Sequence, residues 1–149
     1  MRLEEEIKQK KFRDEYQKAV VNLIYTNNWL VAKHSPIMRE FGLTVQQYNI
    51  LRILRGQYPK PATVNLLKER MLDKMSDASR LVDRLLEKGL LVRKSCEIDR
   101  RRVDITITQE GLDILSKIDV AEEQMYKLLK NISPEEATVL NDLLDKLRG

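Results

Sequence analysis

Apolar residues recur at three- and four-residue steps over most of this 149-residue chain, which is the spacing of an amphipathic helix. The first such pattern extends from Leu3 to His34 without glycine or proline and predicts one long helix, ended by Pro36. A short turn or helix over residues 37–41 then precedes Gly42, a natural left-handed cap. A helix as long as the first one usually packs against something larger than its own small domain.

Two shorter helical patterns follow in the middle of the chain. Thr44 and Gln47 form a capping box that begins the first of them, and Gly56 lies near its end. Thr63 caps the second, which we expect over residues 64–71. The residues that this second helix should turn inward are Leu66, Leu67 and Leu72.

A third pattern, from about Met75 to Lys88, predicts a helix that ends at a glycine. Two short strands are expected after it, at residues 91–96 and 103–107, because apolar and polar residues alternate in the second. The loop between them, residues 97–102, is rich in arginine. A helix followed by a basic two-stranded ribbon is the sequence form of a winged helix-turn-helix, and it indicates duplex DNA as the partner.

The C-terminal part of the chain returns to helical spacing. Thr108 caps a helix that should extend to Asn131, and Ser133 and Pro134 mark a clear start for the last helix. The elements together predict a mainly α fold with a small β-wing, in which terminal helices flank a winged helix-turn-helix.

Composition narrows the function classes. The single cysteine, Cys96, excludes an internal disulfide and indicates a reducing compartment, and the single histidine, His34, argues against a Cys/His metal site. The highly charged first fifteen residues do not form a signal peptide, and no apolar run approaches the ~18 residues of a membrane helix. We therefore expect a cytoplasmic protein without metal, cofactor or membrane partner.

Positive charge is concentrated in the centre of the chain. From Lys60 to Arg102 there are 12 basic and 7 acidic residues, a net charge of +5, whereas the remaining residues carry 15 and 16, a net charge of −1. A basic footprint of this kind is expected where a protein meets nucleic acid. A chance fluctuation of a few charges is the alternative.

On a helical wheel, the helix predicted at residues 75–88 buries one apolar face and exposes a polar stripe. Asp83 and Glu87 occupy its second half, where phosphates would repel them, so the N-terminal half should enter the major groove. There Arg80 would read guanine or hold a phosphate, and Asp77 would accept from cytosine or favour the positive helix end. The apolar face is expected to comprise Ala78, Leu81, Val82, Leu85 and Leu86. The residues expected to face DNA are Ser76, Asp77, Ser79, Arg80 and the flanking Arg84.

The helix before it should cross the DNA backbone, which makes Thr63, Asn65 and Lys68 candidate phosphate contacts, together with Lys74 in the turn. The wing tip contributes Asp99, Arg100, Arg101 and Arg102. Three adjacent arginines repel one another, but a narrow minor groove attracts them, and Asp99 could aim one guanidinium. The alternative is a solvated polar turn with an exposed ion pair worth ~0–1 kcal/mol.

These residues resemble the multiple-antibiotic-resistance regulator (MarR) family of bacterial transcription factors. The resemblance lies in SRLVDRLLEKGLLVR (Ser79 to Arg93), DRR (Asp99 to Arg101) and TITQEG (Thr106 to Gly111), and the order of elements fits nearly the whole chain. It implies that Arg101 enters the minor groove, that Asp99 orients the wing, and that the start of the recognition helix faces the major groove. Asp77 stands where many members carry a neutral residue, which leaves the base preference open.

The resemblance also implies a homodimer that binds a pseudo-palindromic operator and represses nearby genes. Residues 1–35 and 109–149 would form the dimerisation helices, around a DNA-binding part at residues 44–108. A two-fold dimer would bury apolar seams for which the chain has no large domain of its own. An intrachain three-helix bundle is the alternative.

Many relatives release DNA when a small phenolic or other ligand binds between the dimer helices and the winged domain. The residues that could line such a pocket here are Tyr25, Trp29, His34 and Met38. Ordinary packing at a helix junction would explain the same residues. Some relatives sense oxidants through a cysteine in the first helix, but the cysteine here is at position 96, where a lone strand cysteine is usually an inert small hydrophobe.

Two other function classes compete with a DNA-binding regulator. A winged helix can serve as a protein-interaction module without DNA binding, but the three arginines of the tip argue against that. An enzyme is the weakest of the three hypotheses, because the sequence contains no nucleophile elbow, P-loop or HExxH motif.

Overall fold

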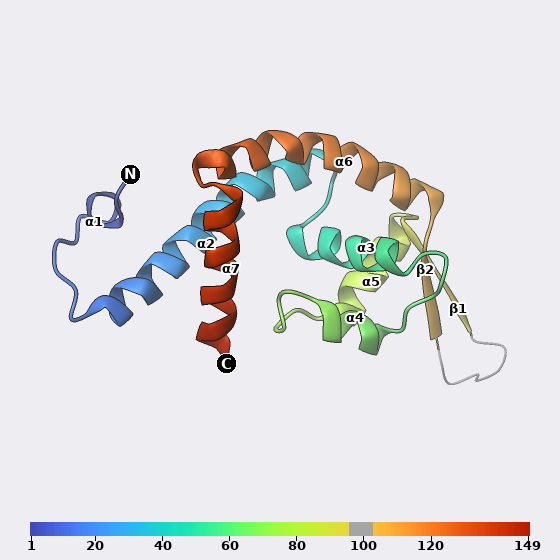
Figure 1. Cartoon of the computed structure of the whole chain (residues 1–149). Coiled ribbons are helices and arrows are strands. Elements are labelled where there is room, and N and C mark those ends of the chain that lie inside the picture. The colour runs from blue at the N-terminus through green and yellow to red at the C-terminus, as the bar shows by residue number, and fades with distance from the viewer. Residues whose placement is uncertain (96–102) are drawn as a thin grey trace.

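The computed structural model describes residues 1–95 and 103–149, which form a mainly helical chain with a small antiparallel sheet (Figure 1). This confirms the expected fold class. No helix among the described residues is long and apolar enough to span a bilayer. The elements in chain order are α1 (Leu3–Glu6), α2 (Glu15–Glu40), α3 (Val45–Gln57), α4 (Val64–Arg70), α5 (Ala78–Glu87), β1 (Leu91–Ser95), β2 (Val103–Ile107), α6 (Gln109–Leu128), the 3-10 turn η1 (Leu129–Asn131) and α7 (Pro134–Arg148).

The N-terminal pattern forms two helices, so the prediction of one continuous helix from residue 3 was wrong. The four-residue α1 ends before Lys8, which adopts a left-handed φ of 54°. Asp14 then starts α2 by accepting a hydrogen bond from the amide of Gln17 (2.7 Å). In a continuous helix Lys8 and Lys11 would lie three residues apart on one face, and repulsion between these like charges disfavours that helix.

The same helix continues past the proline that was expected to end it. Pro36 lies inside α2, which reaches Glu40 before Gly42 turns the chain with a φ of 68°. A proline removes a backbone hydrogen bond from a helix and distorts it, but the turn after Pro36 carries Met38, which is fully buried in the core. Burial of that turn outweighs the local preference of proline to end the helix. The predicted left-handed conformation of Gly42 is confirmed.

The predicted helix caps are confirmed. Thr44 and Gln47 form the expected capping box, with bonds of 3.0 and 3.1 Å between each side chain and the other's backbone amide. Ser133 starts α7 with a second capping box. Thr63 and Thr108 cap α4 and α6 through their hydroxyl oxygens. Each of these caps satisfies backbone donors that a helix start leaves without partners.

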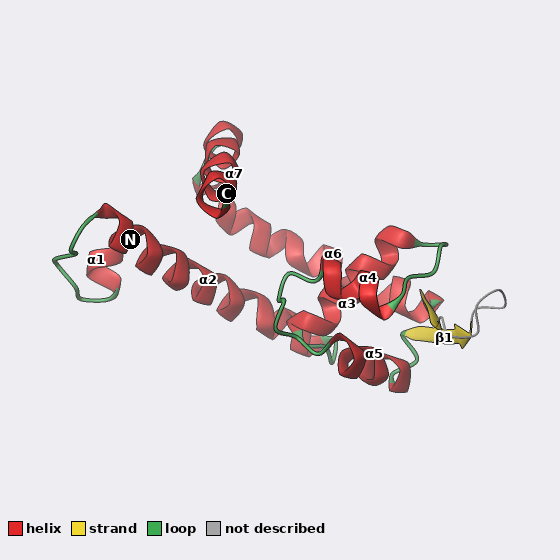
Figure 2. Ribbon diagram, turned by 90° about the horizontal axis from the view of Figure 1, so that it is seen from below, coloured by secondary structure: helices red, strands yellow, loops and turns green. Residues whose placement is uncertain are grey.

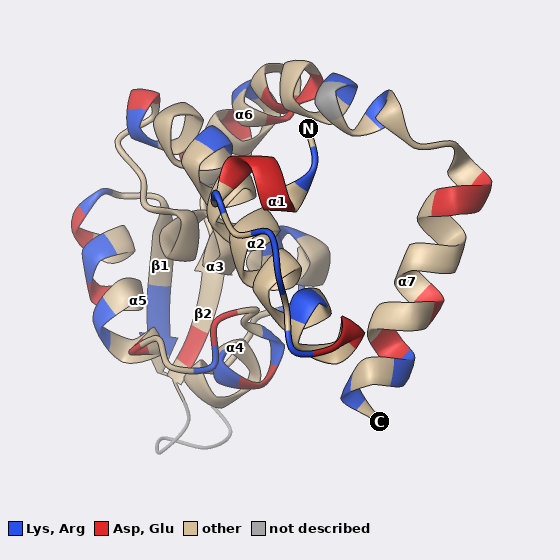
Figure 3. Cartoon of the chain, turned by 90° about the vertical axis from the view of Figure 1, so that its left-hand side faces the viewer, with Lys and Arg blue, Asp and Glu red and all other residues tan. Residues whose placement is uncertain are grey.

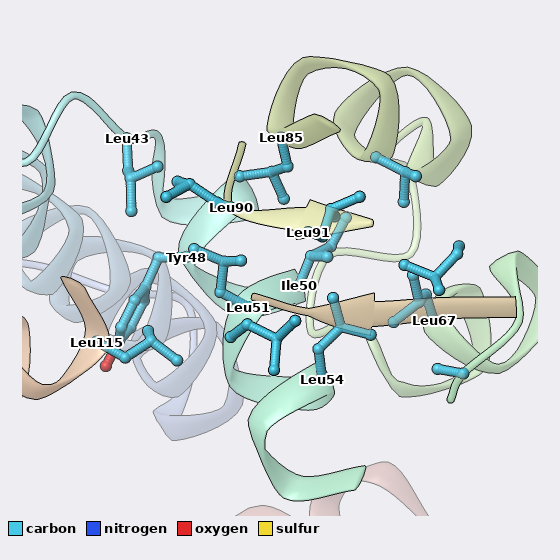
Figure 4. Packing of buried hydrophobic residues seen from close by; sticks show 14 of the residues in the cluster. Leu43, Tyr48, Ile50, Leu51, Leu54, Leu67, Leu85, Leu90, Leu91 and Leu115 are labelled. Atoms are coloured by element: carbon cyan, nitrogen blue, oxygen red, sulfur yellow. The ribbon is translucent and has the colours of Figure 1, made fainter. Parts of the chain in front are cut away.

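The core is built around α3, which contributes Ile50, Leu51 and Leu54 (Figure 4). Leu85 of α5 and Leu91 of β1 pack against them, and all five side chains are almost fully buried. Close packing of this kind fixes the positions of the helix-turn-helix and the wing relative to each other.

The two strands of the wing pair in antiparallel register, from Leu91 opposite Ile107 to Ser95 opposite Val103. A third short segment joins them, because Ala62 exchanges two backbone hydrogen bonds of 2.8 Å with Ile105. The loop before α4 is thereby tied to the wing.

Two predicted core leucines are exposed. Leu72 follows α4 with 87% of its surface exposed, and Leu86, near the end of α5, is 39% exposed. Both were expected to face inward. A helical wheel predicts which way an apolar side chain points, but how far that side chain is buried depends on whether another element packs over it.

The structure divides into two regions that differ in how fully their apolar side chains are buried. We call residues 37–118 the head and residues 1–36 and 119–149 the arms. Among the described residues, every buried apolar side chain except Leu3 belongs to the head. In the arms, α7 leaves the end of α6 in a direction that crosses the axis of α6, and it has no buried residue (Figures 1 and 2).

Candidate nucleic-acid interface

The N-terminal end of α5, the predicted recognition helix, is held by a side-chain cap. The helix begins at Ala78, and the Asp77 carboxylate accepts a hydrogen bond of 3.1 Å from the amide of Arg80. The predicted start near Met75 was therefore too early, and Ser76 lies in the turn before the helix. One carboxylate oxygen of Asp77 is engaged by the helix itself, which agrees with the alternative that Asp77 favours the positive helix end.

The turn between α4 and α5 is organised by Asp73. Its carboxylate accepts hydrogen bonds from the Ser76 hydroxyl (2.8 Å) and the Met75 amide (3.0 Å). These bonds, the hydroxyl's first, hold the pKa of Asp73 below its ordinary value. Asn49 of α3 fixes the same turn by accepting from the Leu72 amide (3.0 Å). The turn thus places the start of α5 relative to α3, and neither Asp73 nor Asn49 was among the predicted site residues.

Two of the predicted base-reading side chains lie on the open surface of α5. Ser79 and Arg80 are both exposed in its first turn. The Arg80 side chain makes no ion pair or hydrogen bond with any of the described residues, so its guanidinium is available to a ligand.

The acidic residues in the second half of α5 are each engaged by an arginine. Asp83 accepts from Arg93 of β1 (2.7 Å), and Glu87 accepts from Arg84 (3.0 Å). Both pairs are largely exposed and contribute ~0–1 kcal/mol each. Their value is positional: the first pair ties the wing to α5, and the second occupies Arg84, which was predicted to face DNA.

The predicted phosphate contacts lie on and after α4. The Thr63 hydroxyl oxygen caps the helix by accepting from a backbone amide three residues on (3.2 Å). Asn65 and Lys68 are exposed. Lys74, in the turn, donates its ammonium group to the carbonyl oxygen of Glu69 (2.5 Å). Of these four, Asn65 and Lys68 have the most open side chains.

The wing adds basic residues that the sequence interpretation did not single out. Arg93 and Lys94 are exposed on β1, which lies beside α5 (Figure 3). Their positive charge is evident in the sequence, but the sequence prediction assigned the DNA contacts of the wing to its arginine-rich tip alone. The predicted tip residues Asp99, Arg100, Arg101 and Arg102, and also Cys96, lie outside the described residues.

The four residues predicted to line an effector pocket lie in three separate places in the folded structure. Tyr25 and Trp29 line a hollow against α1, where the Tyr25 hydroxyl donates to Glu6 (2.6 Å). This bond and then partial burial raise the pKa of Tyr25. His34 lies at a separate cavity, and Met38 belongs to the head core.

The cavity at His34 has a volume of about 470 Å³ and lies where α2, α3, α6 and the turn after α4 meet. Met125 and Leu72 give it apolar walls, and Arg52 and Tyr126 supply polar groups. An apolar hollow with a few polar groups is the usual form of a small-molecule site. Of the predicted pocket residues, His34 alone lines it.

Comparisons with known proteins agree with this architecture. A family model described as the MarR family matches residues 41–102, which include α3, α4, α5 and β1. The chain is 26% identical over 130 residues to the HTH-type transcriptional regulator FarR of Neisseria gonorrhoeae, covering 85% of this chain and 86% of FarR.

Two solved structures extend the similarity to nearly the whole chain. A MarR transcription factor from Planctomyces limnophilus is 29% identical, with a TM-score of 0.68 over 91% of this chain and 98% of that protein. The organohalide-sensing regulator RdhR-CbdbA1625, solved with 2,4-dichlorophenol bound, is 19% identical, with a TM-score of 0.81 over 94% of this chain and 85% of that one. This second likeness concerns the fold alone.

Proposed function

We infer that the chain belongs to the MarR family of DNA-binding transcriptional regulators, and we propose that it acts as a homodimeric repressor that a small molecule releases from its operator. The observation that carries the DNA-binding part is the exposed, capped N-terminal end of α5 within a segment of net charge +5. In the proposed pose this end enters the major groove, and the wing contacts the flanking backbone and minor groove.

Within this pose the residues divide the work. Arg80 is assigned to a guanine or a phosphate, and Ser79 allows the helix backbone to come close to the bases. Asn65 and Lys68 are assigned to phosphates, which position the protein without reading sequence. Arg101, at the tip, is assigned to the minor groove on the basis of the family resemblance. The pairing of Asp83 and Glu87 with arginines reduces their repulsion of the DNA backbone.

The proposed dimer is supported by the uncovered apolar side chains of the arms. Leu143 of α7 is 59% exposed, and Leu140, Leu147, Val20 and Ile24 are similarly open to solvent. A monomer rarely leaves so many large apolar side chains uncovered on two helices. A two-fold contact between these helices would bury them and would place two heads on one DNA duplex.

The effector site is assigned to the cavity of about 470 Å³ at His34. Its apolar walls suit an aromatic ring, and Arg52 and Tyr126 suit a phenolic or carboxylate oxygen. That a regulator of the same fold was solved with a dichlorophenol bound supports this class of ligand for the chain. In this assignment Tyr25 and Trp29 do not contact the effector but pack α2 against α1.

DNA binding is tested with the purified chain and duplexes from the intergenic region beside its own gene, by fluorescence anisotropy at several salt concentrations. Affinity should fall steeply as salt rises, because phosphate contacts release counterions. Arg80→Ala and, separately, Arg101→Ala should each weaken binding by ~1–3 kcal/mol. Lys117→Ala removes an exposed charge from α6, away from the proposed interface, and serves as the control.

Two outcomes would contradict the proposal. Undiminished binding by both arginine variants would remove the assigned contacts. Failure to retain any duplex, together with a salt-insensitive protein partner, would favour the alternative of a winged-helix protein-interaction module.

A further inference from the structure

A buried carboxylate joins three helices at the point where the head meets the arms. Glu122 of α6 is 3% exposed, and its Oε2 accepts a hydrogen bond from the Tyr48 hydroxyl of α3 (2.6 Å). Its Oε1 contacts Nε2 of His34 on α2. Burial and the bond to Glu122 raise the pKa of Tyr48, so the hydroxyl remains a donor. The ring of His34 also packs edge-on against that of Tyr48, with 5.4 Å between centroids.

A second polar link lies one turn earlier on α6. Arg55 of α3 donates to both carboxylate oxygens of Asp119, at 2.6 and 3.1 Å. Immediately before it, Leu115 and Ile118 of α6 are fully buried in the head core, where Leu115 lies near Tyr48 (Figure 4). The polar links therefore begin where α6 leaves the apolar core of the head.

Polar and apolar contacts constrain this junction differently. Apolar packing is non-directional and tolerates small rotations, whereas a hydrogen bond to a carboxylate weakens steeply when its geometry changes. A buried carboxylate without partners is strongly disfavoured. Tyr48 belongs to the head, whereas His34 and Glu122 both belong to the arms. A rotation of the head that moves Tyr48 away from Glu122 would therefore leave a buried carboxylate oxygen without its donor, so the observed angle between head and arms is favoured over neighbouring angles.

We propose that Glu122 is a positioning residue that sets the angle between head and arms, and thereby the half-site spacing of the DNA that the dimer accepts. The inference rests on the dimer of the proposed function. From Glu122 back to Gln109, α6 forms a lever of roughly 20 Å, and one base pair is about 3.4 Å long. A rotation of roughly 5° in each of two heads would therefore change their separation by about one base pair.

The test first selects a duplex from a random-sequence pool with the wild-type protein. Derivatives of that duplex then carry one or two base pairs added to or removed from the centre. The measured quantity is the ratio of the dissociation constant for each altered spacing to that for the selected spacing. The variants are Tyr48→Phe, which deletes the hydroxyl donor and keeps the ring, and Glu122→Gln, which keeps the shape of the side chain and removes its charge.

The wild type should discriminate against the altered spacings by about ten-fold or more, because the DNA must bend or twist to fit. In Tyr48→Phe and Glu122→Gln this ratio should fall by more than two-fold, while discrimination against a mutated half-site stays unchanged. Ile118→Val, a mild truncation in the core on the same helix, is the control. Simple loss of stability would weaken all spacings equally and leave the ratio intact.

A ratio within two-fold of the wild type in Tyr48→Phe would overturn the inference, and that variant decides the matter if Glu122→Gln fails to fold. Failure of the proposed function is distinguishable from this result, because the wild-type protein would then select no duplex at all.

Discussion

The head and the arms are built from the same kind of amphipathic helix, but only the head covers its own apolar faces. In the head, α3 is surrounded by α5, the wing and the start of α6, and Leu51 at its centre is fully buried. In the arms, the apolar seam of α7 contains Leu140, Leu143 and Leu147, all of them exposed. The comparison shows that a strong apolar pattern predicts a helix face that will be buried, but not whether the same chain or a second chain buries it.

The difference also separates the two tasks of the molecule. A complete core lets the head hold Arg80 and the wing in fixed positions, as recognition of DNA requires. In the proposed dimer, the uncovered apolar faces of the arms would make the spacing between two heads depend on a second chain. The polar junction at Glu122 connects these two parts.

The largest effect is expected from the same truncation made in each region. Leu51→Ala should cost ~2–5 kcal/mol of unfolding free energy, because it leaves a cavity in a core that cannot collapse fully. Leu143→Ala should leave the head's unfolding unchanged and should act only through the dimer. Urea denaturation followed by circular dichroism at several protein concentrations measures both. Equal, concentration-independent losses would remove the distinction between head and arms.

Charges placed on the α7 seam should separate the chains. Leu140→Asp combined with Leu143→Asp should raise the dimer dissociation constant by more than about 100-fold, because two unpaired carboxylates would enter an apolar contact. Analytical ultracentrifugation measures the change. The control pair Thr138→Asp and Asn141→Asp adds the same charges to exposed positions on other sides of α7. A dimer that survives the leucine changes would indicate that another surface holds the chains together.

Within the head, two glycines should respond oppositely to alanine. A Cβ on Gly111 would lie 2.3 Å from the carbonyl oxygen of Leu90 and 2.6 Å from a side-chain carbon of Ile107. Gly111→Ala should therefore cost ~1–3 kcal/mol. Gly56 in α3 has no such neighbour within 4 Å, and Gly56→Ala should stabilise the helix by ~0.5–1 kcal/mol. Thermal unfolding compares the two, and a harmless Gly111→Ala would refute the close approach of α6 to the wing.

The smallest effect should come from the two capping boxes. Thr44→Ala in the head and Ser133→Ala in the arms each remove one cap, at a cost of ~0.5–2 kcal/mol. The loss in the head should be the same at every protein concentration. The loss in α7 should appear as weaker dimerisation, measured by dilution series. If Ser133→Ala also destabilises a monomeric variant by the same amount, α7 is held within its own chain.

Local chemistry was the part of the fold that the sequence predicted well. The caps at Thr44, Thr63, Thr108 and Ser133 each bind a backbone amide three residues away, so their signal lies within one short window. The second wing strand was also placed correctly, because alternation of side chains is a local pattern.

Predictions failed where a distant contact outweighed local preference. Pro36 did not end α2, because Met38 in the following turn is buried by the head. Leu72 and Leu86 were assigned to the core because helical periodicity places them on the apolar face of a helix. Whether another element packs over that face cannot be inferred from periodicity. The start of α5 has a local cause instead: Asp73 organises the turn and Asp77 caps the helix, so α5 begins at Ala78 and not near Met75.

The candidate site shows the same difference between features set by neighbouring residues and contacts between residues far apart in the sequence. The sequence alone determined that residues 63–95 hold a basic helix-turn-helix beside a wing strand, because charge and periodicity are properties of neighbouring residues. Only the tertiary structure decided that Tyr48 and His34 meet Glu122, from positions 74 and 88 residues away, and that Tyr25 and Trp29 lie apart from them. Contacts at such separations depend on how helices pack, and no short pattern in one chain records them.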